Sequence, residues 1–119
     1  MIDWEWPGSD GNIGNVIRPE DKVNFTAMLA EFRAQLDAYG AQVGRAYTLS
    51  AFLPADASKI DAGFEVNRIF NHLDYATVQG YDLHGAWEVQ TNHQSQLHSP
   101  PADPHPLKYS IHNAVTAWV

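Results

Sequence analysis

Hydrophobic positions in the first half of this 119-residue chain recur at helical spacing. From about residue 19 to residue 39 they stand three or four residues apart, which gives a helix one apolar stripe. Pro19, followed by two acidic residues, favours a helix start, and Gly40 stands where a left-handed cap would end the helix. The apolar stripe that we expect to face the core comprises Phe25, Met28, Leu29, Phe32, Leu36 and Tyr39.

Two later stretches show the patterns of β-strands. Residues 46–53 form a continuous apolar run closed by Pro54, which is typical of a strand covered on both faces. Residues 74–82 alternate between larger polar or aromatic side chains and small ones. This alternation predicts a strand whose small side faces the helices.

Helices are expected after each of these strands. Residues 58–72 carry helical spacing, which Gly63 weakens. A last helix is predicted from about Ser110 to the end of the chain. The intervening residues 83–108, with four prolines and many polar residues, predict a long loop, and loops of this length are more often functional than idle.

The first residues of the chain also alternate, which predicts a first strand ended by Pro7. In this strand Asp3 and Glu5 would share one face, about 6.6 Å apart, whereas Trp4 and Trp6 would lie on the other face and pack against helices. Acidic residues are poor strand formers, so the pair favours a functional origin. Three strands, each followed by a helix, predict an α/β fold of consecutive parallel units.

The composition and net charge restrict the classes of binding partner. A net charge of −7 disfavours nucleic acid and anionic membranes, whereas a neutral polysaccharide is indifferent to charge and favours the four Trp and five Tyr present. No cysteine is available for a disulfide or a thiolate metal site. We find no apolar run of membrane-spanning length, no export signal within this chain, and no sign of an obligate protein partner.

The histidines do not predict a metal site. Four of the six stand at positions 84, 93, 98 and 105 in the long loop, at spacings that lack the regular pattern of a zinc site. We therefore expect neither a metal nor a cofactor.

Two motifs, in this order, resemble those of family 18 glycoside hydrolases, the chitinases. The start of the chain resembles the family's Asp-x-Asp-x-Glu motif, with Met1 at the place of the first Asp. The second motif resembles the sixth-strand pattern Met-x-Tyr-Asp followed by a His-Gly-aromatic turn, with Gln79 at the place of Met. In this chain it reads Gln79-Gly80-Tyr81-Asp82-Leu83-His84-Gly85-Ala86-Trp87. The resemblance covers essentially the whole chain.

This resemblance implies a partial TIM (β/α)8 barrel of bacterial type, roughly strands four to six with their helices. A whole barrel needs roughly 250 residues. We therefore expect residues 1–119 to be one fragment of a family 18 catalytic domain, with either a start codon or a cut inside the first motif.

The resemblance also implies a chemistry, which is the hydrolysis of β-1,4 links between N-acetylglucosamine units with retention, the substrate's acetamido group acting as nucleophile. Glu5 would be the general acid, and the charge of Asp3 would raise its pKa. Asp3 would then stabilise the oxazolinium ion, and Tyr81 would hold the acetamido group. The residues that would bind the sugar are Asp82, Gln79 and Trp87.

Two alternatives remain beside an active chitinase. One is a catalytically silent, chitin-binding or oligosaccharide-binding relative, although such members commonly lose the acid that Glu5 represents here. The other is that this chain alone does neither, because half a barrel exposes two unpaired strand edges. The resemblance implies that the parent protein is secreted and acts on chitin or chito-oligosaccharides.

Overall fold

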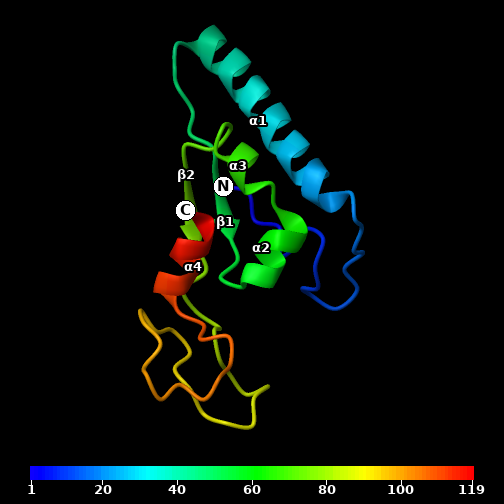
Figure 1. Cartoon of the computed structure of the whole chain (residues 1–119). Helices are drawn as coiled ribbons and strands as arrows, with labels where there is room; N and C mark the ends of the chain where they lie inside the picture. Colours follow the sequence, from blue (N-terminus) through cyan, green and yellow to red (C-terminus); the bar gives the residue numbers. More distant parts are fainter.

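The computed structural model describes residues 1–119 as four helices around a two-stranded parallel sheet (Figure 1). In chain order the elements are α1 (Asp21–Val43), β1 (Ser50–Leu53), α2 (Ala57–Gly63), α3 (Val66–Ile69), β2 (Tyr75–Val78) and α4 (Ile111–Trp118). Strands β1 and β2 pair in parallel, with Ser50 opposite Tyr75 and Leu53 opposite Val78. The predicted α/β class is confirmed.

The chain start lies beside β1, on the edge that β2 does not use. Ile2 forms an isolated parallel bridge with Ala51, and its N–H donates to the Ser50 carbonyl at 2.7 Å. Phe52 N–H donates back to the Ile2 carbonyl at 2.9 Å. The predicted first strand is therefore reduced to one bridge, because the short β1 offers it only these two ladder bonds. Its position still places three parallel segments side by side in chain order.

Helix α1 is longer than the sequence predicts. It passes Gly40 and ends at Gly44, whose left-handed backbone (φ 68°) supplies the cap. Gly40 has a different role, because a Cβ atom there would lie 2.3 Å from the Arg45 carbonyl oxygen. Figure 1 shows the C-terminal half of α1 projecting past the sheet. Phe32 and Tyr39, predicted to be core residues, are consequently exposed, whereas Phe25 and Leu29 are buried.

The predicted helix over residues 58–72 is wrong as a single element, because it breaks into α2 and α3. Between them Phe64 is extended (φ −134°, ψ 133°) and its side chain enters the core. Gly63 contacts Pro7 so closely that a Cβ atom would lie 2.0 Å from the Pro7 carbonyl oxygen. The break thus exchanges one helical turn for the burial of a large aromatic ring.

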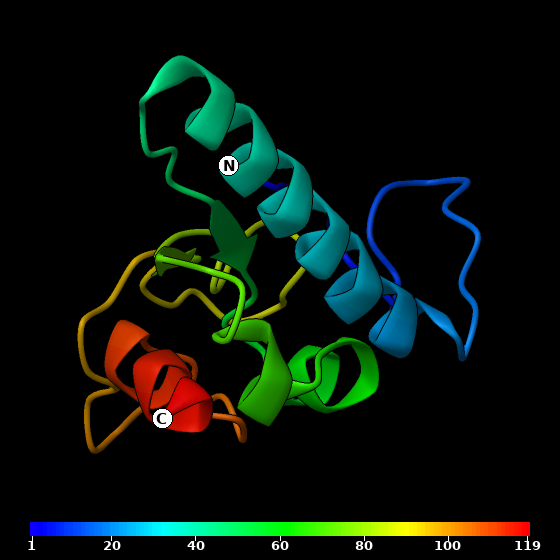
Figure 2. The same cartoon turned by 90° about the horizontal axis from the view of Figure 1, so that it is seen from above.

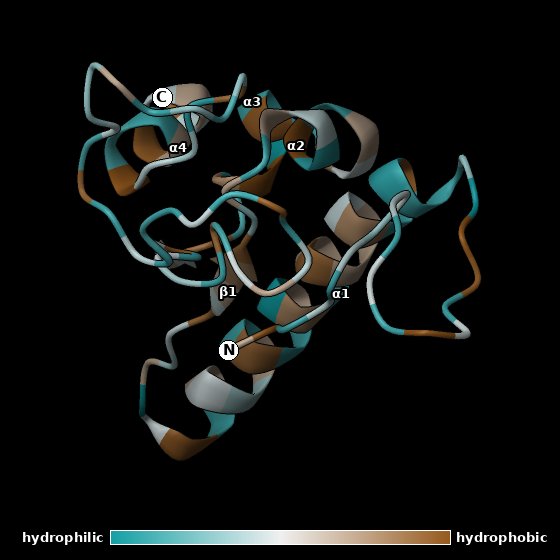
Figure 3. Cartoon of the chain, turned by 90° about the horizontal axis from the view of Figure 1, so that it is seen from below, coloured by the Kyte–Doolittle hydropathy of each residue, from teal (hydrophilic) through white to brown (hydrophobic).

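The core lies where α1, α2 and α4 follow one another around the sheet, with α2 in contact with both of the other helices (Figure 2). Phe64 joins these elements, since its ring lies 5.0 Å from Phe25 and 5.1 Å from Trp118. Figure 3 shows hydrophobic colour concentrated on β1 and alternating along α1. No helix combines the length and the apolar character needed to cross a bilayer.

The predicted last helix and long loop are confirmed. Ser110 caps α4, its hydroxyl accepting the Asn113 N–H at 3.2 Å. No helix or strand lies between β2 and α4, and this loop hangs beyond the carboxyl ends of the strands (Figure 1).

Candidate active site

The parallel arrangement gathers polar residues at one edge of the sheet. Asp3 and Glu5 follow the Ile2 bridge, Asp56 follows β1, and the segment from Gln79 follows β2. Because parallel strands have their carboxyl ends at the same edge, these separate stretches meet there. This is the edge at which the long loop lies.

Glu5 has a raised pKa in this structure. Partial burial raises its pKa, and the negative charge of Asp3 and a hydrogen bond with Asp3 raise it further. Lys59 acts in the opposite direction, while Asp82 adds to the increase. Both Asp3 and Glu5 remain open to solvent. The predicted increase in the pKa of Glu5 is confirmed, although burial contributes more to it than the neighbouring charge of Asp3.

A cleft of about 270 Å³ lies next to these acids. The predicted substrate-binding residues Gln79, Asp82 and Trp87 all line it. The remaining lining residues are Trp6, Ala55, Asp56, Lys59, Leu83 and Tyr109. Asp3, Glu5 and Tyr81 are not among the residues that line the cleft. Glu5 nevertheless lies close enough for the charges of Asp82 and Lys59 to affect its pKa.

A row of aromatic rings connects the two motifs. Trp6 stacks on Phe52 with 5.7 Å between ring centroids, and Phe52 stacks on Tyr81 at 6.1 Å. Trp4 packs against Phe25 of α1, as predicted for the face opposite the acids. Trp6 differs from its prediction, because it is buried on the strand β1 and also lines the cleft.

The turn after β2 orients Asp82. Asp82 has a left-handed backbone (φ 53°), which Asp tolerates better than most side chains. Gln94 Nε2 donates to Asp82 Oδ1 at 2.6 Å, and the Ser95 hydroxyl donates to the Gly80 carbonyl. The predicted third strand over 74–82 is therefore too long, because β2 ends at Val78 and the turn takes over.

The sequence analysis missed three polar residues of the cleft, Asp56, Lys59 and Tyr109. The Tyr109 hydroxyl donates to Asp56 Oδ2 at 3.0 Å, and Ser58 N–H donates to Asp56 Oδ1 at 2.8 Å. Partial burial works to raise the pKa of Asp56, but these hydrogen bonds outweigh it and lower the pKa. Burial and the contact with Asp56 raise the pKa of Tyr109, so its hydroxyl remains a donor. Lys59 lies 5.9 Å from the centre of the Trp6 ring.

Of these three residues, only Asp56 could have been predicted from the sequence, because it follows a predicted strand. In barrel enzymes the catalytic residues lie at this end of the strands. Lys59 lies on a predicted helix, and Tyr109 lies in a loop whose path no periodicity describes.

The irregular spacing of the loop histidines did not predict a metal site, but two of them lie close together in the structure. His84 and His105 both contact Glu88, at 2.9 and 3.5 Å respectively. These three side chains are the group in this structure that could hold a metal ion.

Comparison with known proteins agrees with this geometry. The model of the glycosyl hydrolases family 18 matches residues 2–119. Chitinase A1 of Niallia circulans is 40% identical over 101 residues, which make up 85% of this chain and 14% of that protein.

Two solved structures are similar over 98% of this chain. The catalytic domain of the psychrophilic chitinase B from Arthrobacter TAD20 superposes with a TM-score of 0.90 at 49% identity. A cell-surface-expressed chitinase from Paenibacillus sp. str. FPU-7 has a TM-score of 0.86 at 39% identity. The chain spans 28% and 13% of these two chains, so it corresponds to less than a third of each relative.

Proposed function

Because the chain belongs to glycosyl hydrolase family 18, we propose that it carries the acid and part of the sugar site of a chitinase, and that Glu5 is the general acid. The observation that carries the proposal is the raised pKa of Glu5 beside Asp3, next to a cleft lined by Asp82. A general acid must hold its proton until the leaving oxygen takes it, and a raised pKa serves that need.

The proposed reaction has two steps. Glu5 protonates the glycosidic oxygen while the bond from that oxygen to the anomeric carbon breaks, and the substrate's acetamido oxygen bonds to the same carbon. Asp3 stabilises the resulting oxazolinium ion, and Tyr81 holds the acetamido group in line. A water then attacks the anomeric carbon and gives a proton to Glu5, while the bond from that carbon to the acetamido oxygen breaks and restores the acetamido group, so that the configuration is retained.

The geometry supports this route over a carboxylate nucleophile. Asp3 interacts directly with Glu5, so both carboxyl groups would meet a bound sugar from the same side. A protein nucleophile would have to attack the face of the sugar opposite the leaving group that Glu5 protonates. The acetamido oxygen of an N-acetylglucosamine unit can reach that face.

The cleft supports a sugar as the ligand. It combines the indole rings of Trp6 and Trp87 with the polar groups of Gln79 and Asp82, the mixture of flat apolar and hydrogen-bonding surface found in small-molecule sites. Chitin or a chito-oligosaccharide is the proposed ligand. Since the polymer is outside cells, we propose that the parent protein acts there, as the cell-surface-expressed relative does.

Substitution Glu5→Gln in the complete catalytic domain tests the assignment. The amide cannot donate the proton, so turnover should fall by about 10²- to 10⁴-fold while KM changes little. Glu31→Gln is the matched control, because Glu31 is exposed on α1 away from the cleft. Retention of more than about a tenth of the activity would remove Glu5 from this role. A wild-type domain that binds chito-oligosaccharides without turnover would identify a silent binding protein instead.

The substrate-assisted route has its own test. Oligosaccharides with a free amine at C2 of the cleaved sugar should be inert, because they lack the nucleophile. A thiazoline mimic of the oxazolinium ion should bind far more tightly than the corresponding sugar. Mass spectrometry that finds a glycosyl ester on Asp3 or Asp82 would refute the route and leave the family assignment intact.

We also propose that the 119-residue chain is inactive by itself. Its sheet has two strands, and catalytic groups must be held within a fraction of an ångström by a rigid framework. The purified chain should therefore show no hydrolysis of soluble chito-oligosaccharides above a Glu5→Gln control.

A further inference from the structure

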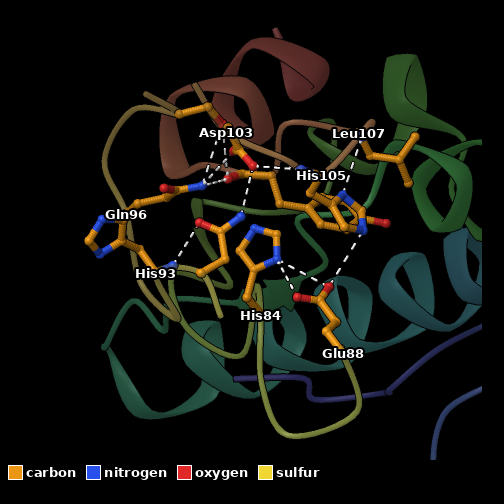
Figure 4. A network of polar contacts seen from close by, with 10 residues as sticks. His84, Glu88, His93, Gln96, Asp103, His105 and Leu107 are labelled. Carbon is orange, nitrogen blue, oxygen red and sulfur yellow. Dashed lines mark hydrogen bonds and ion pairs between the residues drawn. The ribbon is translucent and has the colours of Figure 1, made fainter. Parts of the chain in front are cut away.

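We propose that His84, Glu88 and His105 form a binding site for a divalent transition-metal ion, with Zn²⁺ as the best match. The site lies in the long loop and uses none of the residues assigned to the hydrolysis. Figure 4 shows the two imidazole rings on either side of the Glu88 carboxylate. One potential ligand atom from each residue lies within 4.8 Å of the other two.

The distances suit a tetrahedral ion. Zinc bonds of about 2.0–2.2 Å to nitrogen and oxygen place neighbouring ligand atoms roughly 3.3–3.5 Å apart. Glu88 Oε1 lies 3.1 Å from His84 Nδ1 and 3.5 Å from His105 Nε2. Small rotations therefore open a position between the three atoms. Two histidines and one glutamate are a common zinc ligand set, with water as the fourth ligand.

Burial and hydrogen bonding distinguish this cluster from a solvated group of charges. His84 is only 1% exposed, and its Nε2 atom is buried without any hydrogen-bond partner. Without a metal, His84 Nδ1–H donates to the Glu88 carboxylate at 2.9 Å. A metal ion at Nδ1 would replace that proton, and the neutral imidazole would then carry its proton on Nε2, which has no competing partner. The side chains of Glu88 and His105 are 19% and 25% exposed, which leaves an ion a path from solvent.

The loop backbone already presents two of the ligands. Glu88 N–H donates to the Gly85 carbonyl at 3.1 Å, in the turn that brings Glu88 back to His84. His105 N–H donates to Asp103 Oδ1 at 2.9 Å. Metal binding has a cost at His84, where the hydrogen bond to Glu88 is replaced, and a second cost at His105. His105 Nδ1 accepts the Leu107 N–H at 3.3 Å and must carry a proton when Nε2 binds an ion. That contact is long and weak, so its loss costs little.

A metal at this position would connect the two ends of the loop. His84 lies near the start of the loop that follows β2, whereas His105 stacks on Tyr109, with 5.0 Å between ring centroids, just before α4. Trp87 and Tyr109, which line the cleft, would both be held by the same ion. We therefore assign the ion a structural role in fixing the cleft wall.

Zinc titration calorimetry on the complete catalytic domain, stripped of metal by a chelator, tests the proposal. Wild-type protein should bind one Zn²⁺ at this site. Glu88→Gln and His105→Gln should each weaken the affinity at least about tenfold, since even the loss of an outer hydrogen-bond partner costs a metal site that much. The matched controls are His93→Gln, an exposed loop histidine, and His112→Gln, which removes one ring of the separate His98–His112 pair at 4.8 Å. Both controls should keep the wild-type affinity.

Three results would overturn the site: no stoichiometric binding to the wild type, unchanged affinity in both variants, or an equal loss in His112→Gln. A second measurement uses the wild-type protein and is independent of how the variants fold. Chemical modification of histidines, read by mass spectrometry, should be blocked by Zn²⁺ at His105 and not at His93, and equal modification at His105 with and without Zn²⁺ would refute the site. Neither readout depends on hydrolysis, so failure here leaves the proposed function untouched.

Discussion

Replacement of Trp118 by Phe should loosen the connection between the last helix and the strand that leads to the cleft. The indole Nε1–H of Trp118 donates to the Pro54 carbonyl at 2.9 Å inside the protein. Pro54 ends the buried run of β1, and Asp56 of the cleft follows two residues later. The Trp118 ring also packs edge-on against Phe64, with centroids 5.1 Å apart. One side chain therefore holds α4, the core and the cleft approach together.

The expected loss of stability has two parts. A phenyl ring cannot donate to Pro54, and a buried carbonyl left without a partner costs about 1–3 kcal/mol. The smaller ring also removes about two buried carbon groups, worth about 1.5 kcal/mol at roughly 0.8 kcal/mol each. Phe64 keeps an aromatic neighbour, so the stacking is not lost. We expect a decrease of about 2.5–4.5 kcal/mol in the free energy of unfolding.

Urea denaturation of the complete domain, followed by circular dichroism, measures this decrease. With a slope near 3 kcal/mol per molar urea, the midpoint should fall by about 1 M. Trp87→Phe is the matched control, because the same substitution at a side chain that is 66% exposed should leave the midpoint within about 0.2 M. A Trp118→Phe midpoint as close to wild type as the control would show that the Pro54 carbonyl is not stabilised by this hydrogen bond.

Two further predictions concern pH. Asp3→Asn removes a charge that raises the pKa of Glu5, so the basic limb of the activity profile should move to lower pH, although burial keeps part of the increase; a basic limb that stays in place or rises would contradict this origin of the shift. The carboxyl of Asp103 accepts the His105 N–H and further side-chain hydrogen bonds, which lower its pKa from 3.8 to about 2. A carboxyl whose pKa is lower in the folded protein stabilises the fold fully at pH values above its pKa in the unfolded chain. This contribution is lost as the pH falls through its pKa in the folded protein. The wild-type protein should therefore lose stability between about pH 4 and pH 2, and Asp103→Asn should flatten this dependence in acid unfolding experiments; an equally steep decrease in the variant would assign it to another group.

The sequence was sufficient wherever a property depends on neighbours along the chain. The spacing of apolar residues predicted α1, the continuous run after it predicted β1, and Ser110 marked the start of α4. The order of these elements then predicted a parallel sheet, and a parallel sheet requires that Glu5, Asp56 and Gln79 meet at one edge. The acid pair and the Tyr81-Asp82 motif were visible for the same reason, because each lies within a few consecutive residues.

The tertiary structure decided what depends on contacts between distant segments. Gly40 and Gly63 were interpreted as a helix cap and a weak helical position, but each is needed where another backbone segment approaches it closely. Phe64 left the helical path because a place in the core stabilises its ring more than one helical turn does.

The long loop shows the limit of sequence patterns most clearly. Its residues follow no period, so no rule along the chain could bring Tyr109 to Asp56, or His84 to His105. Those contacts result from the loop's own hydrogen bonds and from where β2 and α4 hold its ends. The chemistry of the strand ends could therefore be derived from the sequence, whereas the completed cleft wall and the histidine cluster exist only because the chain folds back on itself.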